Sequence, residues 1–512
     1  MTTSRRGFLW LSGVAAMGSL VPELQSQASD ASQKALRQKV ASDPLRPQYH
    51  LLPASNWMND PNGPIFFRGR YHMFHQYNPK GAVWGNMNWA HATSPDMVHW
   101  FHEPIALAPT PSGYDRDGVF SGSAVLDGGT PTVIYTGVLP PGSDAEATLR
   151  DGKHVWREVQ CLAVAKDDEL LTWNKLPEPV IASPPPGLRV TGFRDPVMWR
   201  EGDSWMLILG SGFKNRGGAI LLYRSPDLRR WTYLHTLVEA PGNGKQTVNS
   251  VDNGEMWECP DFFPLGDKHV LLISTMGKVF WKVGTYKDQR FSPEKEGVVD
   301  WGAYYAAKSM PDRDGNRILW GWIPETRPEA EHSAAGWAGA MSLPRVLSLN
   351  AENELQMEVA PAVQQLRRSH SGFSGNMNSA RQKVLDSVRI TDLAAELSVE
   401  FQLKPWQAFS LRLSPESGED FAVITCVDKT EGREIRVNNL VAPLSGAPGS
   451  VRLRIFLDAS VLEVFANGAT VMTVRVYRVP SGPLHLSFEG EAEVNSVDVW
   501  QIQPISKHRL TS

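Results

Sequence analysis

One pattern recurs five times in the middle of the 512-residue chain and restricts its fold more than any other feature. Each copy holds a short motif, an apolar strand, a turn with Gly or Asp, and a second apolar strand. The motifs begin at residues 59, 120, 194, 258 and 304. Strand-rich repeats of this length are typical of β-propeller blades, whose innermost strands line a common axis. The pattern therefore predicts a propeller in which the five motifs face one funnel.

Three of the motifs carry a carboxylate, at Asp60, Asp195 and Glu258. These acids lie far apart in sequence, but equivalent positions on inner strands would bring them together. Asp-Pro pairs are also common turn formers, so any one motif alone could be a strand-start turn. Five copies in step, three of them acidic, favour a catalytic or binding site.

A second, weaker repeat follows some of these units. Residues 94–100 (SPDMVHW) match residues 225–231 (SPDLRRW), and residues 168–173 are a looser copy. We interpret them as an outer hairpin turn that returns in successive units.

The sequence changes character after about residue 350. Residues 350–381 are more polar and are interpreted as a linker region. Short alternating strands are then predicted at residues 395–403, 409–413, 421–427, 451–456, 461–465, 471–476 and 484–488. Seven or so short strands separated by turns are typical of a β-sandwich. The predicted fold is all-β, with a β-propeller over residues 44–349 and a β-sandwich over residues 382–512.

Charge and cysteine content exclude several classes of protein. The formal net charge of −4 provides no basic field, so no nucleic-acid partner is expected. Cys161, Cys259 and Cys426 are too few and too widely spaced for a disulfide framework or a CxxC metal knuckle. The oligomeric state stays open.

The first 28 residues have the features of an export signal. Arg5 and Arg6 precede a short apolar run at residues 8–21, and small residues follow at 26–28. A paired arginine before such a run resembles a twin-arginine signal. The run is too short and too rich in Gly, Ser and Ala to span a bilayer well, although an uncleaved anchor is the alternative. We expect a periplasmic or extracellular protein with no integral membrane segment in its mature form.

Three ordered motifs resemble the signatures of glycoside hydrolase family 32, the invertase, inulinase and levanase family. They are residues 56–63 (NWMNDPNG), 194–196 (RDP) and 256–261 (MWECPD). A tripeptide alone is weak, whereas an eight-residue motif with two ordered partners is specific. The resemblance extends over about residues 47–500. It implies a five-bladed β-propeller followed by a C-terminal β-sandwich.

The resemblance also implies roles for the acids: Asp60 as nucleophile, Glu258 as acid/base, and Asp195 as a ligand of fructosyl hydroxyls. Cleavage of a glycosidic bond through an oxocarbenium-like state normally uses two carboxyl groups in the first two roles. Three neighbouring carboxylates also raise the proton affinity of at least one, as an acid catalyst requires. The fructose pocket is expected to be completed by Trp57, Asn59, Gln76, Trp84, Phe120, Ser121 and Arg194.

The implied partner is a carbohydrate, sucrose or a fructan, whose terminal β-D-fructofuranosyl residues are hydrolysed with retention. The carboxylates suit sugar hydroxyls better than calcium, so no metal and no cofactor are expected. Plant invertases often carry an acid shortly after the third signature. Residues 273–278 (ISTMGK) contain none, which favours fructan over sucrose.

Three other functions share parts of this pattern. A fructosyltransferase would carry the same signatures, because water and an acceptor sugar compete for one fructosyl-enzyme. A catalytically inactive sugar-binding propeller is disfavoured by the intact set of three acids. An arabinan-cleaving propeller enzyme is disfavoured by residues 56–63 and by the added sandwich.

Overall fold

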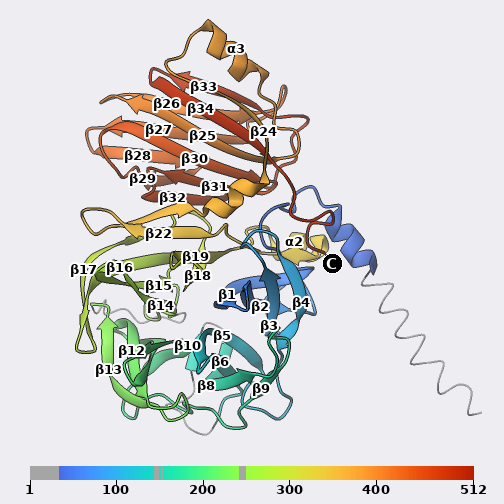
Figure 1. The fold of residues 1–512 in the computed structure, drawn as a ribbon. Coiled ribbons are helices and arrows are strands. Elements are labelled where there is room, and N and C mark those ends of the chain that lie inside the picture. Colours follow the sequence, from blue (N-terminus) through green and yellow to red (C-terminus); the bar gives the residue numbers. More distant parts are fainter. Residues whose placement is uncertain (1–33, 143–148, 152–153, 242–249, 512) are drawn as a thin grey trace, which may run out of the picture.

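Five sheets follow one another within the described part of residues 56–359. The structure is a computed structural model that describes residues 34–142, 149–151, 154–241 and 250–511. The five sheets form the lower body of the molecule in Figure 1, and the strands from β24 onward form the upper body. The helical elements in the described part include α2 (Glu329–Ala335), the 3₁₀-helix η1 (Pro361–Leu366) and α3 (Ser379–Ser387).

The first three sheets use strands from the first half of the chain, apart from one late strand in the first sheet. The first holds β1 (Asn56–Phe67), β2 (Arg70–Asn78), β3 (Asn88–Ser94), β4 (Phe101–Leu107) and β20 (Trp337–Ala338). The second holds β5 (Gly118–Asp127), β6 (Thr130–Leu139), β7 (Leu149–Asp151), β8 (His154–Ala165) and β9 (Trp173–Lys175). The third holds β10 (Val190–Glu201), β11 (Ser204–Phe213), β12 (Gly217–Ser225) and β13 (Thr232–Glu239).

The remaining two sheets complete the lower body. The fourth holds β14 (Glu258–Leu265), β15 (Lys268–Thr275), β16 (Lys278–Lys287) and β17 (Arg290–Val298). The fifth holds β18 (Tyr305–Pro311), β19 (Arg317–Ile323), β21 (Ala340–Met341), β22 (Arg345–Leu349) and β23 (Leu355–Val359). Tight turns join the antiparallel strands: Arg68 and Gly69 between β1 and β2 both have positive φ, as the turn of a two-residue hairpin requires.

The first strands of the five sheets contact one another in a closed ring. β1 contacts β5, β5 contacts β10, β10 contacts β14, β14 contacts β18, and β18 returns to β1. β20 comes late in the chain but pairs in parallel with β1 through Asn56↔Trp337 and Trp57↔Ala338. The repeat region therefore ends on the sheet where it began, and the five motif-bearing strands surround one axis (Figure 1).

The SPD segments form the same outer turn in the first and third sheets, as predicted. Asp96 Oδ1 accepts hydrogen bonds from the backbone N–H groups two and three residues later, and Asp227 Oδ1 does the same. Met97 and Leu228 each have a positive φ, of 68° and 62°. The aspartate side chain satisfies the backbone donors of the turn, which explains why this residue recurs.

Two sheets form the upper body. One holds β24 (Arg367–Ser374), β25 (Ala394–Leu403), β30 (Gly449–Asp458), β31 (Val461–Ala466), β32 (Thr470–Arg475) and β34 (Glu493–Ile502). The other holds β26 (Ala408–Ser414), β27 (Ala422–Lys429), β28 (Gly432–Val437), β29 (Leu440–Pro443) and β33 (His485–Gly490). Apolar residues of both sheets, among them Leu397, Leu411 and Leu453, share one buried cluster.

Residues 350–381, interpreted as a linker, hold regular structure for most of their length. β23 belongs to the fifth sheet, η1 follows it directly, and β24 already pairs with β34 of the upper body. Asn378 Oδ1 then caps α3 by accepting from two backbone N–H groups. The chain thus passes from one body to the other within η1.

A buried cluster of charged side chains lies between the two bodies. His50 Nδ1 is 2.7 Å from Asp458 Oδ2, and His50 Nε2 is 3.0 Å from Glu463 Oε1. Arg345 Nη2 is 2.6 Å from Glu463 Oε2 and 2.9 Å from Asp300 Oδ2. All five side chains are inaccessible to solvent. Ion pairs here connect β30 and β31 of the upper body to the lower one.

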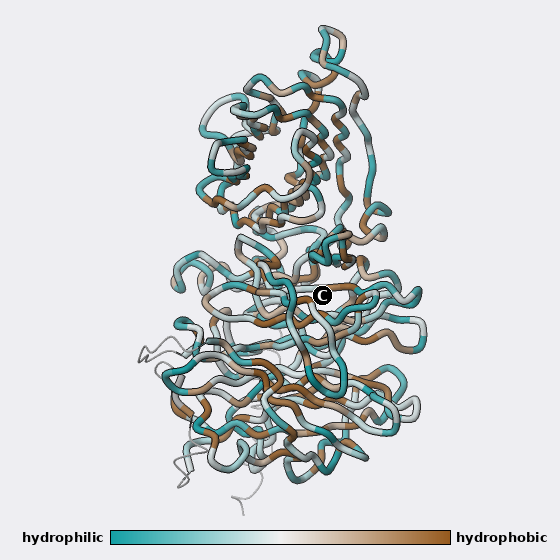
Figure 2. The backbone as a smooth tube through the Cα atoms, turned by 90° about the vertical axis from the view of Figure 1, so that its left-hand side faces the viewer, coloured by the Kyte–Doolittle hydropathy of each residue, from teal (hydrophilic) through white to brown (hydrophobic). Residues whose placement is uncertain are grey.

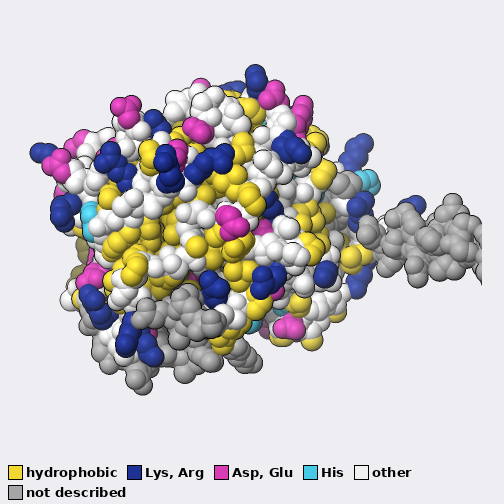
Figure 3. Space-filling model, turned by 90° about the horizontal axis from the view of Figure 1, so that it is seen from below, with side chains coloured by type: hydrophobic (Ala, Val, Ile, Leu, Met, Phe, Trp, Pro, Cys, Tyr) yellow, Lys and Arg dark blue, Asp and Glu magenta, His cyan; other side chains and the backbone are white. Residues whose placement is uncertain are grey.

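Hydrophobic segments run along strands inside both bodies, and hydrophilic segments gather in the loops (Figure 2). Seen from below, side chains of both charge signs are interspersed among hydrophobic ones, so this described surface carries no large field of one sign (Figure 3). Within the described ranges no helix is long and apolar enough to cross a membrane. The predicted export signal, residues 1–28, lies outside the described residues.

Candidate active site

A cavity of about 520 Å³ opens where the five motif-bearing strands meet. All three predicted acids line it, together with six of the seven residues expected in the fructose pocket. Trp57 is the exception. The lining residues are Asn59, Asp60, Gln76, Trp84, Phe120, Ser121, His154, Trp156, Arg194, Asp195, Glu258, Tyr305 and Trp322.

An irregularity in every inner strand directs its motif toward the axis. In β1, β5, β10, β14 and β18 the pairing register with the next strand shifts at the motif. A bulge adds a residue to one strand and re-aims the side chains beside it. Asp195, Cys259 and Ala306 have positive φ values of 64°, 46° and 53° there, a conformation uncommon for residues with side chains. The repeated motif is thus a repeated bulge.

Three side chains hold the Asp60 carboxylate. Asn59 Nδ2 donates to Oδ1 at 3.0 Å, whereas Ser121 Oγ and Cys259 Sγ donate to Oδ2 at 2.6 Å and 3.3 Å. Because these donors come from β1, β5 and β14, the carboxylate is fixed where three sheets meet. Trp57 is buried behind this group, and its indole N–H donates to Asn59 Oδ1 at 2.8 Å.

Asp195 is buried on β10, next to the first acid. The backbone N–H of Cys259 donates to its Oδ2 at 2.8 Å, and its own N–H donates to Thr136 Oγ1 at 3.0 Å. Burial raises the pKa of Asp195 to about 6, and Asp60 acts in the same direction, whereas Arg194 lowers it. The local contacts fix both the backbone and one carboxylate oxygen.

Glu258 is held between a guanidinium and a phenol. Arg194 Nη2 donates to Glu258 Oε1 at 2.7 Å, and Tyr305 OH donates to Oε2 at 2.7 Å. Burial nevertheless raises the pKa of Glu258 to about 7, with the charge of Asp195 adding to it and the ion pair with Arg194 opposing it. Arg194 also donates through Nη1 to the buried Glu158 at 3.0 Å. One cation therefore serves two carboxylates, and Glu258 can change its protonation state near neutral pH.

Aromatic side chains surround the mouth of the cavity. Trp84 is 43% exposed and lies edge-on to Phe120, with ring centroids 6.0 Å apart. His154 stacks on Trp156 at 5.1 Å and also lies 5.1 Å from Trp84. Such rings suit the apolar faces of sugars. Deeper in the cavity, Gln76 is fixed because its side-chain amide donates to the Val119 carbonyl.

Sequence reasoning did not identify five residues that shape this site: His154, Trp156, Glu158, Tyr305 and Trp322. Tyr305 belongs to the fifth motif and could have been assigned from its place in the repeat. The first three lie on β8, the third strand of its sheet, where no motif marks them.

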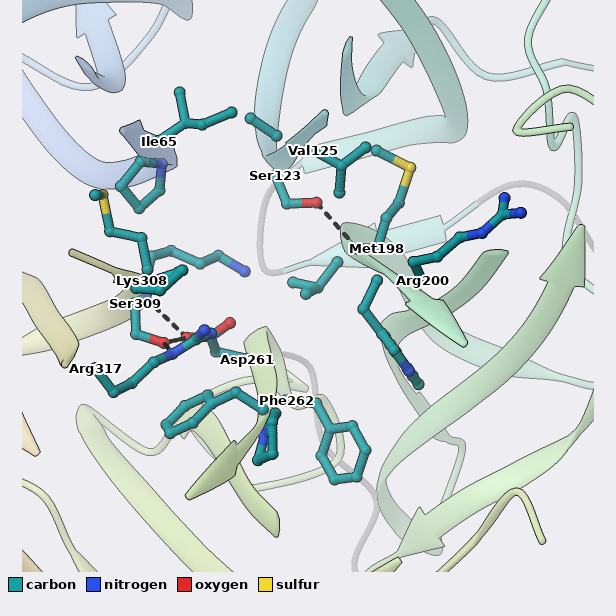
Figure 4. Close-up of a pocket in the computed structure, with 18 of the residues that line it drawn as sticks. Ile65, Ser123, Val125, Met198, Arg200, Asp261, Phe262, Lys308, Ser309 and Arg317 are labelled. Atoms are coloured by element: carbon teal, nitrogen blue, oxygen red, sulfur yellow. Dashed lines mark hydrogen bonds between the residues drawn. The ribbon is translucent and has the colours of Figure 1, made fainter. Parts of the chain in front are cut away.

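A second cavity, of about 850 Å³, lies past the bulges toward the other end of the inner strands (Figure 4). Its walls are mostly apolar and include Ile65, Val125, Met198 and Phe262. Lys308 projects into it, close to Asp261 and Ser309 in Figure 4. No cluster of side chains suited to holding a metal ion occurs in the described ranges.

Comparison with known proteins connects this geometry to one family. Residues 50–360 match the glycosyl hydrolases family 32 N-terminal domain, and residues 362–501 match the glycosyl hydrolases family 32 C-terminal domain. A sucrose-6-phosphate hydrolase of Escherichia coli is 36% identical over 458 residues, which cover 85% of this chain and 90% of that protein. A raffinose invertase of Escherichia coli is 34% identical over 492 residues, with 89% and 95% covered.

The fold agrees with these matches. The solved structure of fructan 1-exohydrolase IIa from Cichorium intybus superposes with a TM-score of 0.75 at 26% identity, covering 90% of this chain and 98% of that one. A β-fructofuranosidase of Bombyx mori superposes with a TM-score of 0.72 at 27% identity, covering 93% and 99%. By both domain matches and by its relatives, the chain belongs to glycosyl hydrolase family 32.

Proposed function

We propose that this protein is a β-fructofuranosidase that releases terminal β-D-fructofuranosyl residues from sucrose or fructans by a retaining double displacement. The observation that carries the proposal is the convergence of Asp60, Asp195 and Glu258 in one cavity, where burial gives Glu258 a pKa of about 7. Relatives named sucrose-6-phosphate hydrolase, raffinose invertase and β-fructofuranosidase support the substrate class.

In the first step, Asp60 attacks the anomeric carbon while Glu258 gives its proton to the leaving oxygen. The glycosidic bond breaks, and an ester forms between Asp60 and the fructosyl unit. In the second step, Glu258 takes a proton from water as that water attacks the anomeric carbon. Fructose leaves, Asp60 is free again, and Glu258 is once more protonated.

Asp195 binds the fructosyl hydroxyls in this proposal. The Cys259 N–H occupies its Oδ2, so Oδ1 is available to accept from the sugar. Hydrogen bonds from hydroxyls that become more acidic as positive charge develops on the ring strengthen in the transition state. The aromatic mouth formed by Trp84, Phe120 and His154 is suited to the leaving sugar.

We infer that the five sheets are the blades of a five-bladed propeller and that residues 44–349 form the catalytic domain. Residues 382–512 form the β-sandwich domain, and residues 350–381 connect the two. The closed ring of contacts among the five inner strands supports this division. So does the change from one domain match to the other near residue 361.

Product analysis on sucrose, inulin and levan tests the function. We infer that the axial motifs close the inner end of the cavity, which then admits one terminal fructosyl unit, so early digestion of either fructan should release fructose alone. Short oligosaccharides in the first few per cent of reaction would contradict exo attack. Longer oligosaccharides formed at high sucrose concentration would instead identify a fructosyltransferase.

We also propose export through a twin-arginine signal, on the basis of Arg5 and Arg6. Lysine in both places keeps the charge but removes the guanidinium groups that the export receptor reads. The double variant should accumulate as a precursor in the cytoplasm, as measured by cell fractionation. If the double variant is found outside the inner membrane in the same amount as the wild type, another export route operates.

A further inference from the structure

Lys308 is a buried cation on the axis of the lower body. It lies on β18 directly after the bulge and is only 2% exposed. Its Nζ donates to the Pro260 carbonyl at 2.6 Å. The residues at the same register position on the five inner strands are Pro61, Gly122, Val197, Asp261 and Lys308. Lys308 is therefore the one cation among these five equivalent positions.

The carbonyl that Lys308 binds belongs to the bulge that contacts two of the catalytic-site acids. Cys259, the residue before Pro260, donates its backbone N–H to Asp195 and its thiol to Asp60. Cys259 has a φ of 46°, so the bulge needs support from its surroundings to keep this shape. Lys308 provides that support from below, because it anchors the next carbonyl in the chain.

Acidic side chains outnumber cationic ones around the Cys259 bulge. Five acids surround the bulge: Asp60 on β1, Glu158 on β8, Asp195 on β10, and Glu258 and Asp261 on β14. Two neutral titratable groups, Cys259 and Tyr305, lie among them. The cations are Arg194, which pairs with Glu158 and Glu258, and Arg317, which lies over the Phe263 ring and donates to Ser309. Lys308 is the cation whose ammonium lies beneath the Cys259 bulge.

We propose that Lys308 is a positioning residue of the reaction, which holds the β14 bulge in place and keeps Asp195 ionised so that it can accept hydrogen bonds from the sugar. This inference rests on the proposed β-fructofuranosidase function. Its charge opposes the effect of burial, which raises the pKa of Asp195 to about 6.

The test uses Lys308→Ala and the cavity behind it. The removed atoms correspond to n-propylammonium, and the cavity of about 850 Å³ that Lys308 lines gives this cation a way in. Without the charge, the acid limb of the kcat/KM profile on sucrose should move to higher pH, and a move of about one pH unit lowers activity at pH 6 about fivefold. Because the ionised Asp195 raises the pKa of Glu258, the basic limb should not move to higher pH, and the profile should become narrower. Added n-propylammonium should restore activity at least threefold, and 1-propanol should not.

Two further variants separate charge from folding. Lys308→Gln keeps a donor for the Pro260 carbonyl but has no charge, so it should fold and still show the shifted acid limb. Lys278→Ala is the matched control: Lys278 also donates to backbone carbonyls, those of Trp301 and Gly302, but lines neither cavity. It should show neither the shift nor rescue by n-propylammonium.

The outcomes are distinct. If the wild-type protein has no activity on sucrose, inulin or levan, the proposed function fails. If the wild type is active and Lys308→Gln keeps an unshifted profile, the role of Lys308 is overturned. Rescue of Lys308→Ala by 1-propanol as well as by n-propylammonium would show that the side chain only fills space, and would also overturn it.

Discussion

The molecule buries two clusters of carboxylates that behave in opposite ways. At the axis of the lower body, burial raises the pKa of Asp195 to about 6 and that of Glu258 to about 7. Between the two bodies, the paired cations lower the pKa of Glu463 to about 2 although burial acts against them, and the pKa of His50 rises to about 9. Asp195, Glu463 and His50 are all buried, so burial alone does not decide the outcome.

The cationic partners of each carboxylate make the difference. Between the bodies, Glu463 accepts from Arg345, His50 and the Leu343 N–H, and Asp458 accepts from His50 and three further backbone N–H groups. At the axis, Glu258 shares its one cation, Arg194, with Glu158. A cluster in which each carboxylate has a cationic partner connects the two bodies, whereas the axial cluster, with one cation shared by Glu158 and Glu258, keeps a proton available for chemistry.

The largest expected effects separate the acids at the axis. Asp60→Ala should abolish turnover of every fructoside, because no fructosyl-enzyme can form. Glu258→Ala should lower the rate on sucrose by about 10²–10⁴-fold but spare the first step on an activated fructoside, whose leaving group needs little protonation. Asp195→Ala should impair both substrates alike.

The measurement is the ratio of activity on an activated fructoside to activity on sucrose for each variant. A ratio that rises for Glu258→Ala alone supports the assignment. If this ratio rises for Asp60→Ala instead, the assignments of nucleophile and acid/base are reversed.

Removal of a cation between the bodies should act on stability rather than on chemistry. Arg345→Met leaves Glu463 and Asp300 buried with fewer donors, which typically lowers the free energy of unfolding by about 3–5 kcal/mol. Denaturant unfolding measures this loss, and kcat per folded molecule should stay near that of the wild type. The control is Arg452→Met, because Arg452 pairs with the partly exposed Glu358. An equal loss of stability in this variant would show that burial of the ion pair does not matter.

The two clusters should also differ in how pH affects stability. His50 has a folded pKa of about 9 against 6.5 in the unfolded chain, so its contribution to stability is complete below pH 6.5 and is lost as the pH rises to 9. Glu258 has a folded pKa of about 7 against 4.5, so the native state becomes less favoured as the pH rises from 4.5 to 7. His50→Gln should therefore flatten the fall of Tm between pH 6.5 and 9, whereas Glu258→Gln should raise Tm at pH 8.

Thermal unfolding between pH 5 and 9 checks both changes. A Glu258→Gln variant that is less stable than the wild type at pH 8 would show that the axial carboxylate is not under-paired. A His50→Gln variant with an unchanged slope would locate the alkaline transition elsewhere.

The sequence predicted best those site residues that lie on the repeated inner strands. The three acids could be assigned because each lies in or directly before the same bulge, and the bulge leaves a short motif in the sequence. His154 and Glu158 could not, because they join the site from a third strand by tertiary packing. In the upper body, β28 and β29 were not predicted, since β28 (GREIRV) has only two apolar positions, Ile435 and Val437, and β29 is only four residues long.

Residues 350–381 show a second reason why part of the fold could not be predicted from the sequence. Their polar composition suggested a linker, but β24 is an edge strand whose side chains are mostly exposed. An edge strand needs only one paired neighbour and tolerates polar residues on both faces. Composition therefore could not distinguish it from a loop. The charged partners His50 and Arg345 were likewise invisible, because the pairs join residues about 120 to 410 positions apart.

The smallest expected effect tests how finely the axial cluster is positioned. Trp57 was expected to shape the pocket, but it acts through Asn59, which in turn donates to Asp60. Trp57→Phe keeps most of the ring and removes one neutral hydrogen bond, which is typically worth about 0.5–1.5 kcal/mol, or about two- to tenfold in rate. The matched control is Trp173→Phe, which removes a neutral indole N–H bond to the Leu170 carbonyl away from the cavity. If positioning matters, kcat/KM on sucrose falls for Trp57→Phe only, while the two variants lose similar stability. Equal losses of kcat/KM would mean that the bond to Asn59 supports the fold and not the orientation of Asp60.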